Sequence, residues 1–163
     1  MKILVVSDTH GYIGSEIIEH AQSVDEVWHA GDIGSVEVLR ELQKHAVVRA
    51  VYGNIDAIDV RQETTKNLYF ETHGVSVCMT HIGGYPGKYN PDFKMYMQTH
   101  NPRIIVCGHS HILKVMHDSQ KSALFINPGA IGTHGFHTVR TMIEFEIVHK
   151  IPQNMKVIEY NRV

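Results

Sequence analysis

Short apolar runs alternate with amphipathic segments along the first third of the chain, and this alternation constrains the fold more than any other feature. The runs that have the length of buried strands lie at residues 3–6, 26–28 and 47–51. Between them we expect a helix over residues 15–23, capped by Ser15, and a second helix capped by Ser35. Strands joined through helices run parallel with right-handed crossovers, so this order predicts a parallel sheet.

The second half of the chain is richer in strands. Residues 68–71 and 75–80 flank His73-Gly74 and are typical of an antiparallel hairpin. We expect a helix over residues 92–99, with Pro91 near its start. Further strands are expected at residues 104–107, 114–117, 123–126, 138–145 and 155–160.

Length and charge exclude several classes of protein. The 163 residues are expected to form one domain over residues 1–163 with a core of its own. No apolar run approaches the roughly 20 residues that cross a bilayer, and the first run is too short for a secretion signal, so we expect a cytoplasmic protein without a membrane partner. A net charge of −2 makes nucleic acid an unlikely partner, because duplex binding needs a broad basic surface.

Polar side chains that can bind metal ions follow five of the predicted strands. They are Asp8, His10, Asp32, Asn54, His81, His109 and His111. Binding sites in open α/β sheets form outside the carboxyl ends of the strands, so we expect these side chains to meet at one rim. Residues i and i+2 of an extended segment point the same way, which predicts that Asp8 pairs with His10 and His109 with His111.

The ordered pattern DxH…GD…GN…H…GHxH resembles the five-block signature of the calcineurin-like metallophosphoesterase superfamily. The short chain and the Gly-Asn-x-Asp block are similar to its small prokaryotic phosphodiesterase branch. The resemblance extends from Met1 to the segment Asn127-Pro128-Gly129. It implies an α/β fold, a four-layer α/β/β/α sandwich of two mixed sheets with the helices outside.

The resemblance also implies two divalent metal ions. The first would be held by Asp8, His10, Asp32 and His111, and the second by Asn54, His81 and His109, with Asp32 bridging both. Imidazole and carboxylate ligands without thiolate suit Mn²⁺ or Ni²⁺, which we expect first, and also Fe, Co²⁺ or Zn²⁺. Two such ions carry +4 and the two carboxylates return −2, so the site stays positive and favours a phosphate group.

The function implied by the resemblance is hydrolysis of a small or nucleotide-like phosphodiester by a hydroxide that bridges the two ions. His81 and Asn54 are expected to contact the phosphate or the nucleophile. Asp56 and His29 are expected to support the ligands from behind, although His29 is equally well explained as a buried structural histidine. The histidines His134 and His137 are expected on a surface loop, with a place in the lining of the cleft as the alternative.

One position departs from the pattern. Many superfamily members carry a histidine directly after the Gly-Asn pair, where it helps to protonate the leaving group, and this chain has Ile55. An isoleucine cannot transfer a proton, so we expect a preference for good leaving groups such as aryl phosphodiesters. The alternatives are a phosphomonoesterase or a nuclease with the same site, and a non-catalytic scaffold like the retromer subunit that the branch also resembles. Homo-oligomer formation is left open.

Overall fold

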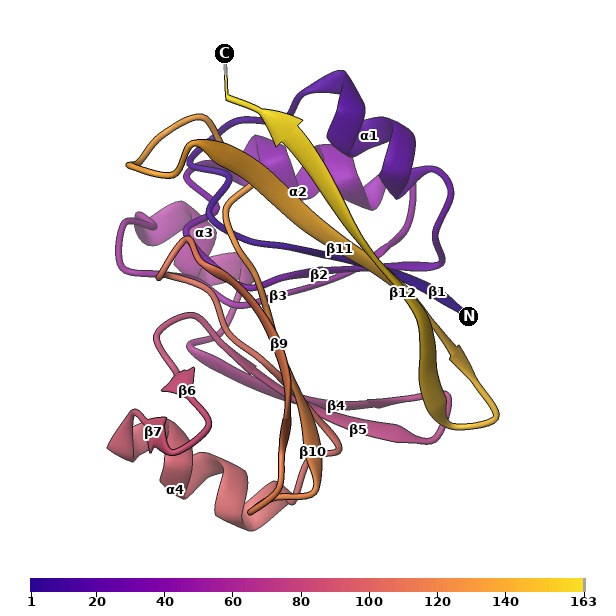
Figure 1. Ribbon diagram of the computed structural model, residues 1–163. Coiled ribbons are helices and arrows are strands. Elements are labelled where there is room, and N and C mark those ends of the chain that lie inside the picture. Colours follow the sequence, from indigo (N-terminus) through magenta and orange to yellow (C-terminus); the bar gives the residue numbers. More distant parts are fainter. Residues whose placement is uncertain (163) are drawn as a thin grey trace.

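Two five-stranded sheets face each other in the computed structural model, which describes residues 1–162 (Figure 1). Val163, the last residue of the predicted domain, lies outside the described residues. The first sheet has the order β12-β11-β1-β2-β3. Its strands are β1 (Lys2–Val6), β2 (Glu26–His29), β3 (Val47–Ala50), β11 (Val139–Val148) and β12 (Ile151–Asn161). β1, β2 and β3 run parallel as predicted, and β11 and β12 add to β1 as an antiparallel hairpin.

The second sheet has the order β4-β5-β8-β10-β9. Its strands are β4 (Asn67–Thr72), β5 (Val75–Thr80), β8 (Ile104–Val106), β9 (Leu113–Asp118) and β10 (Ala123–Pro128). β4 and β5 form the expected antiparallel hairpin, whereas β5, β8 and β10 run parallel. Both sheets are therefore mixed, as expected.

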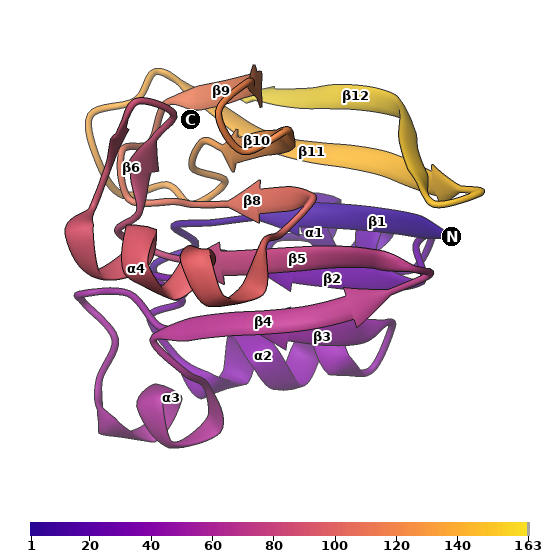
Figure 2. The same cartoon turned by 90° about the horizontal axis from the view of Figure 1, so that it is seen from below.

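Helices cover the outer face of each sheet (Figures 1 and 2). The first sheet carries α1 (Ser15–Ala21), α2 (Val36–Gln43) and α3 (Ile58–Glu63), and the second carries α4 (Pro91–His100). Separate apolar clusters lie under these helices and between the sheets. The predicted four-layer α/β/β/α sandwich is confirmed.

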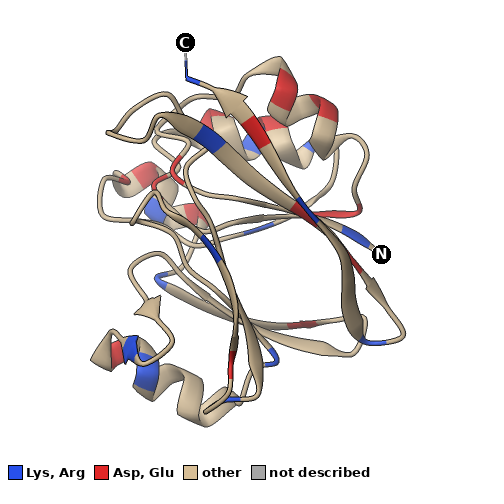
Figure 3. Cartoon of the chain, viewed as in Figure 1, with Lys and Arg blue, Asp and Glu red and all other residues tan. Residues whose placement is uncertain are grey.

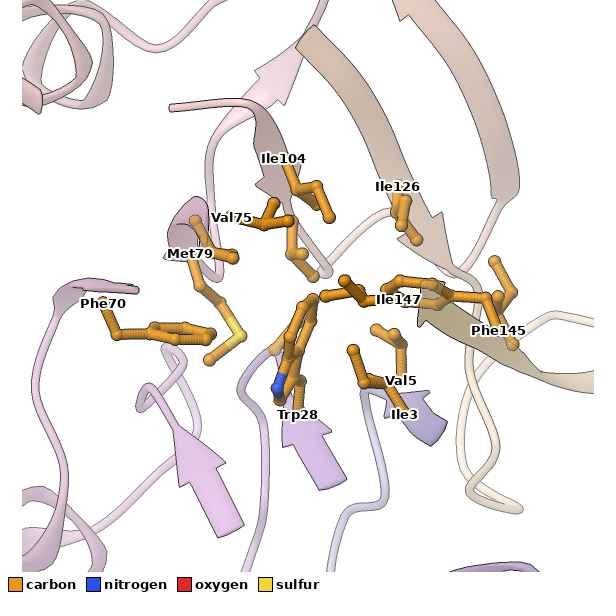
Figure 4. Packing of buried hydrophobic residues seen from close by; sticks show 14 of the residues in the cluster. Ile3, Val5, Trp28, Phe70, Val75, Met79, Ile104, Ile126, Phe145 and Ile147 are labelled. Carbon is orange, nitrogen blue, oxygen red and sulfur yellow. The ribbon is translucent and has the colours of Figure 1, made fainter. Parts of the chain in front are cut away.

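The space between the sheets is filled by large apolar side chains (Figure 4). The fully buried Trp28 ring meets Phe70 of the second sheet edge-on at 5.2 Å between ring centres, and Phe145 of the first sheet at 5.5 Å. Edge-to-face aromatic pairs contribute about 0.5–1.5 kcal/mol beyond the area they bury. This packing sets the sheets at a constant distance, so the loops at one end of both sheets can meet.

Local structure differs from the sequence predictions at four places. Gly14, not Ser15, is the N-cap of α1, and Ser35 occupies the N-cap of α2 without a hydrogen bond from its side chain. α3 was not expected, because its N-cap is Ala57 and offers no capping signal. The two-residue strands β6 (Gly84–Tyr85) and β7 (Lys88–Tyr89) were also not expected, since they are too short to show a periodicity. β12 begins earlier than expected.

No helix among residues 1–162 is both long enough and apolar enough to cross a membrane.

Candidate metal centre

The loops that follow the strands of both sheets are joined by backbone hydrogen bonds. The N–H of Asp8 after β1 donates to Gly31 after β2 at 2.9 Å. The N–H of Gly108 after β8 donates to His81 after β5 at 3.0 Å. The N–H of His109 then donates to the Asp8 carboxylate at 3.2 Å, which connects the two sheets. The strand ends therefore converge at one rim of the sandwich.

Five of the seven predicted ligands have a left-handed backbone. Their φ angles are 56° for Asp8, 49° for His10, 50° for Asp32, 69° for His109 and 56° for His111. Only a few per cent of residues other than glycine adopt such angles, and each costs on the order of 1–3 kcal/mol unless the surroundings impose it. The extended arrangement that the sequence suggested for Asp8 with His10 and for His109 with His111 is therefore wrong. Asp8 and His10 nevertheless contribute to one group of ligand atoms, whereas His109 and His111 contribute to two different groups.

The structure gathers six of the predicted ligands into two groups. Asp8, His10 and His111 offer ligand atoms that lie within 4.8 Å of one another, and Asp32, His81 and His109 do the same. The Asp32 carboxylate faces both groups, because its Oδ1 lies 3.2 Å from His81 Nε2 and its Oδ2 lies 3.8 Å from His10 Nε2. Asn54 lines the cleft beside them.

Several ligand atoms are buried without a hydrogen-bond partner. They are Asp8 Oδ1, His10 Nε2 and His81 Nε2. A buried polar atom left unpaired costs about 1–3 kcal/mol, so such atoms rarely gather in one place without a reason. The Nδ1–H of His81 donates to the carbonyl of Ala30 at 2.7 Å, which leaves the lone pair of Nε2 facing the carboxylates. Lone pairs and carboxylates that face one another fit a divalent cation.

The pKa values of Asp32, His81 and His111 are shifted toward their charged forms, whereas burial lowers the pKa of His10. Burial raises the pKa of the Asp32 carboxyl, but the neighbouring His81 and the N–H of Ile55 outweigh this and hold that pKa below its usual value. Burial lowers the pKa of His81, yet Asp32 and Asp8 raise it above the ordinary value of histidine. The Asp8 carboxylate at 3.1 Å likewise raises the pKa of His111. Protons on these rings occupy the places that a metal ion would take, since binding releases them.

The family model of the calcineurin-like phosphoesterase superfamily domain matches residues 1–150. The chain belongs to this superfamily. It is therefore a metal-dependent phosphoesterase, and the family implies divalent metal ions. A probable metallophosphoesterase of Methanothermobacter thermautotrophicus is 28% identical over 137 residues, which cover 80% of this chain and 77% of the relative.

Solved structures share the fold at low sequence identity. An archaeal phosphodiesterase has a TM-score of 0.74 at 24% identity and covers 97% of this chain and 100% of its own. Vps29 of Entamoeba histolytica complexed with zinc has a TM-score of 0.75 at 17% identity and covers 100% of both chains. These similarities show that this phosphoesterase domain shares its fold with both proteins.

Asp56 ties two loops of the phosphoesterase site together. Its buried carboxylate accepts hydrogen bonds from the N–H groups of Gly53 at 2.7 Å, Gly34 at 2.7 Å and Ile33 at 3.1 Å. The loop that carries Asn54 is thereby held against the loop that carries Asp32. This is the position expected of a residue that supports the ligands from behind.

His29 takes the structural role that the sequence offered as an alternative. The N–H of Gly31 donates to its Nδ1 at 3.2 Å, so its proton lies on Nε2 and bonds to Thr9 at 2.9 Å. Complete burial lowers the pKa of His29 to about 4. The ring is neutral and braces the loops after β1 and β2, and it makes no hydrogen bond to a ligand carboxylate.

His134 and His137 lie on the loop that was expected, where His134 is exposed, and both also line the cleft, which was the alternative. The ring centre of His134 lies 5.1 Å from that of His10, and Nδ1 of His137 lies 3.2 Å from Nδ1 of His111. The Nε2–H of His137 donates to the carbonyl of Gly132 at 2.9 Å. The segment between β10 and β11 folds back onto the metal centre, and sequence spacing gave no sign of this.

Asn127 is a further residue that sequence reasoning did not assign. Its side-chain amide donates to the carbonyl of Gly108 at 2.9 Å and to the hydroxyl of Ser110 at 3.1 Å. It therefore anchors the loop that carries His109 and His111. The only signal in the sequence was its place in the Asn-Pro-Gly segment of the resemblance.

A cleft of about 530 Å³ opens over the two groups. Its rim carries three large apolar side chains, namely Ile55, Ile112 and the fully exposed Phe136. No lysine or arginine is among the residues that line it. Ile55 lines this cleft, and its backbone N–H donates to the Asp32 carboxylate at 3.1 Å.

Proposed function

We propose that this metal-dependent phosphoesterase is a phosphodiesterase that hydrolyses a small or nucleotide-like phosphodiester at a centre of two divalent ions. The observation that carries the proposal is the Asp32 carboxylate, which faces two separate groups of unpaired ligand atoms. Such an arrangement suits two ions that share one carboxylate.

The residues that would hold the ions follow from the two groups. Asp8, His10 and His111 would hold the first ion with one oxygen of Asp32, and His81, His109 and Asn54 would hold the second with the other. Donors of nitrogen and oxygen suit Mn²⁺ or Ni²⁺, with Fe, Co²⁺ and Zn²⁺ as alternatives. When bound, two such ions neutralise phosphate charge and make a water molecule nucleophilic.

Side chains of this protein orient the phosphate, and Ile55 places no proton donor beside the leaving group. His81 is fixed by its hydrogen bond to Ala30, which leaves its Nε2 for an ion, and Asn54 is held through Asp56, so its side-chain amide can contact the phosphate from a rigid loop. Ile55 offers no proton to the departing oxygen. We therefore expect rates that fall as the pKa of the leaving group rises, because general-acid help of about 10²–10⁴-fold is lacking.

The charge of the cleft favours a diester over a monoester. A phosphodiester carries one negative charge and a monoester nearly two, and the cleft adds no lysine or arginine to the charge of the ions. Its apolar rim also suits the organic groups of a diester. Basic and acidic residues are interspersed over the described elements without a basic stripe, which disfavours a nuclease (Figure 3).

The test is hydrolysis of a bis-aryl phosphate, an aryl monophosphate and single-stranded DNA, each with Mn²⁺ and with chelator. We expect the diester to react at least about tenfold faster in kcat/KM than the others, and chelator or Asp32→Ala to abolish turnover. Asp59→Ala, an exposed carboxylate on α3, serves as the matched control with full activity. Turnover that survives chelator or Asp32→Ala would overturn the two-ion centre. Failure to hydrolyse any ester with metal bound would favour the scaffold function.

Cytoplasmic location stays a prediction of the sequence, which makes no prediction of the oligomeric state.

A further inference from the structure

A second hollow of about 290 Å³ adjoins the metal centre. One of its walls is the turn that contains Gly84 and Tyr85 of β6, and the opposite wall is the segment from His109 to Lys114. His109 and Ile112 line both this hollow and the cleft over the metal groups. A group bonded to a phosphorus atom at the centre can therefore reach the hollow directly.

The walls of the hollow expose large apolar side chains. Ile82 is 44% exposed, Tyr85 40% and Ile112 63%. Single exposed apolar side chains are common on protein surfaces, but apolar side chains that gather around one concavity mark a binding site. The floor is also apolar, because it includes the buried ring of Phe125.

The polar groups of the hollow are already engaged. The side-chain amide of Asn127 donates to the carbonyl of Gly108 and to the hydroxyl of Ser110, so its N–H groups are not free to bind a polar ligand. The ammonium of Lys114 lies 4.4 Å from the centre of the Tyr85 ring, within the range of a cation–π interaction. This cation disfavours a positively charged occupant and leaves a neutral or electron-rich ring as the best match.

The turn that carries Tyr85 is held in place. The N–H of Asn90 donates to the carbonyl of Gly83 at 2.9 Å, and a Cβ at Gly83 would collide with the sulfur of Cys107. β6 and β7 pair across the turn. The hollow is thus preformed, which lowers the entropy cost of binding.

We propose that this hollow binds a planar aromatic group, an aryl ring or a nucleobase, attached to the phosphodiester that the metal centre hydrolyses. Tyr85 offers its exposed ring beside the ammonium of Lys114, and Ile82 and Ile112 add exposed apolar side chains to the walls. The proposal rests on the proposed function, because the phosphate at the centre brings the aromatic group to the hollow. It assigns Tyr85 and Ile112 to substrate specificity.

The experiment measures binding of phenylphosphonate and methylphosphonate to the Mn²⁺-loaded protein by calorimetry, and by competition against a bis-aryl phosphate. We expect phenylphosphonate to bind about tenfold more tightly, since stacking on an aromatic side chain has an effect of this size. Tyr85→Ala and Ile112→Ala should bring the ratio of the two dissociation constants close to one. Tyr85→Phe should keep it, because the ring remains.

Ile58→Ala removes another exposed isoleucine, 71% exposed on α3, and should leave the ratio unchanged. A wild-type ratio near one, or a ratio that Tyr85→Ala leaves intact, would overturn the aromatic site while the phosphodiesterase proposal stands. Binding of neither phosphonate, together with no hydrolysis of any ester, would contradict the proposed function itself. In that case the exposed apolar surface would be assigned to a protein partner.

Discussion

Hydrogen bonds to single histidines decide which ring nitrogens face the metal centre. His137 uses its Nε2–H for the carbonyl of Gly132, so its Nδ1 accepts the Nδ1–H of His111. The Nε2 of His111 is then left to face Asp8 at 3.1 Å. A neutral ring with this proton placement is the form that binds a metal.

We expect His137→Ala to weaken Mn²⁺ binding by about 10–100-fold, the usual effect of removing a group that orients a ligand histidine. His137→Asn should restore much of the affinity, because its carbonyl oxygen can accept the Nδ1–H of His111. Titration calorimetry measures both, and His117→Ala on the exposed strand β9 is the control. Equal affinity in all four proteins would contradict the orienting role.

The buried His29 makes stability depend on pH. Its pKa is about 4 in the folded protein and about 6.5 in an unfolded chain, so the unfolded state binds more protons between these values. The free energy of unfolding should therefore fall as the pH drops from about 6.5 to 4, by about 3 kcal/mol in total for this group.

Urea unfolding of the metal-free protein between pH 7.5 and 5 tests this dependence. His29→Gln removes the titrating ring, so the variant should lose less stability on acidification than the wild type. His117→Gln should behave as the wild type does. Parallel pH curves for the wild type and His29→Gln would show that the ring is not neutral when buried.

At the scale of elements, the ends of short strands place every predicted ligand. Buried strands with continuous apolar sequence were recognised because strands covered on both faces carry few polar residues. α3, β6 and β7 were not recognised, since a helix without a capping side chain and strands of two residues leave no periodic signal. A turn at Tyr85 could be read from its glycines, but the second hollow could not, because it needs the segment from His109 to Lys114 as its other wall.

Gly53 follows β3 where no side chain fits. A Cβ at this position would overlap the carboxylate of Asp32 and approach the ring of His81. We expect Gly53→Ala to weaken Mn²⁺ binding at least about tenfold while the protein stays folded, because the collision displaces the shared ligand.

Gly87→Ala provides the contrast. A Cβ there meets nothing within 4 Å, but the backbone has a φ of +89°, which costs a side chain about 1–2 kcal/mol. This variant should lose stability and keep its metal affinity, as measured by thermal unfolding and calorimetry. The reverse pattern in the two variants would refute the packing explanation.

At the scale of the whole molecule, the proposed metal centre draws its candidate ligands from both sheets. Asp8 and Asp32 follow strands of the first sheet, and His81 and His109 follow strands of the second. Ions bind only when both sheets are assembled, so binding free energy adds to the free energy of unfolding.

With free Mn²⁺ at 100 times the dissociation constant of a site, we expect the free energy of unfolding to rise by about 2.7 kcal/mol for each such site that fills. Trp28, the single tryptophan, is buried between the sheets and reports the transition by fluorescence. One cooperative transition is expected for a single domain, and Asp32→Ala should lose the metal-dependent shift. Two separate transitions, or a shift that persists in Asp32→Ala, would contradict this account.

The sequence by itself determined the short buried strands and the candidate ligands that follow them, because apolar periodicity and the residues after each strand are local properties of the chain. The four-layer arrangement and the assignment of those residues to two ions came from the resemblance to the superfamily. Only the tertiary structure decided how those residues are held. Three features depend on contacts between distant segments. They are the left-handed backbone at Asp8 and Asp32, the contact of His137 with His111, and the second hollow beside His109. Such contacts form only when both sheets pack, and no local pattern encodes them.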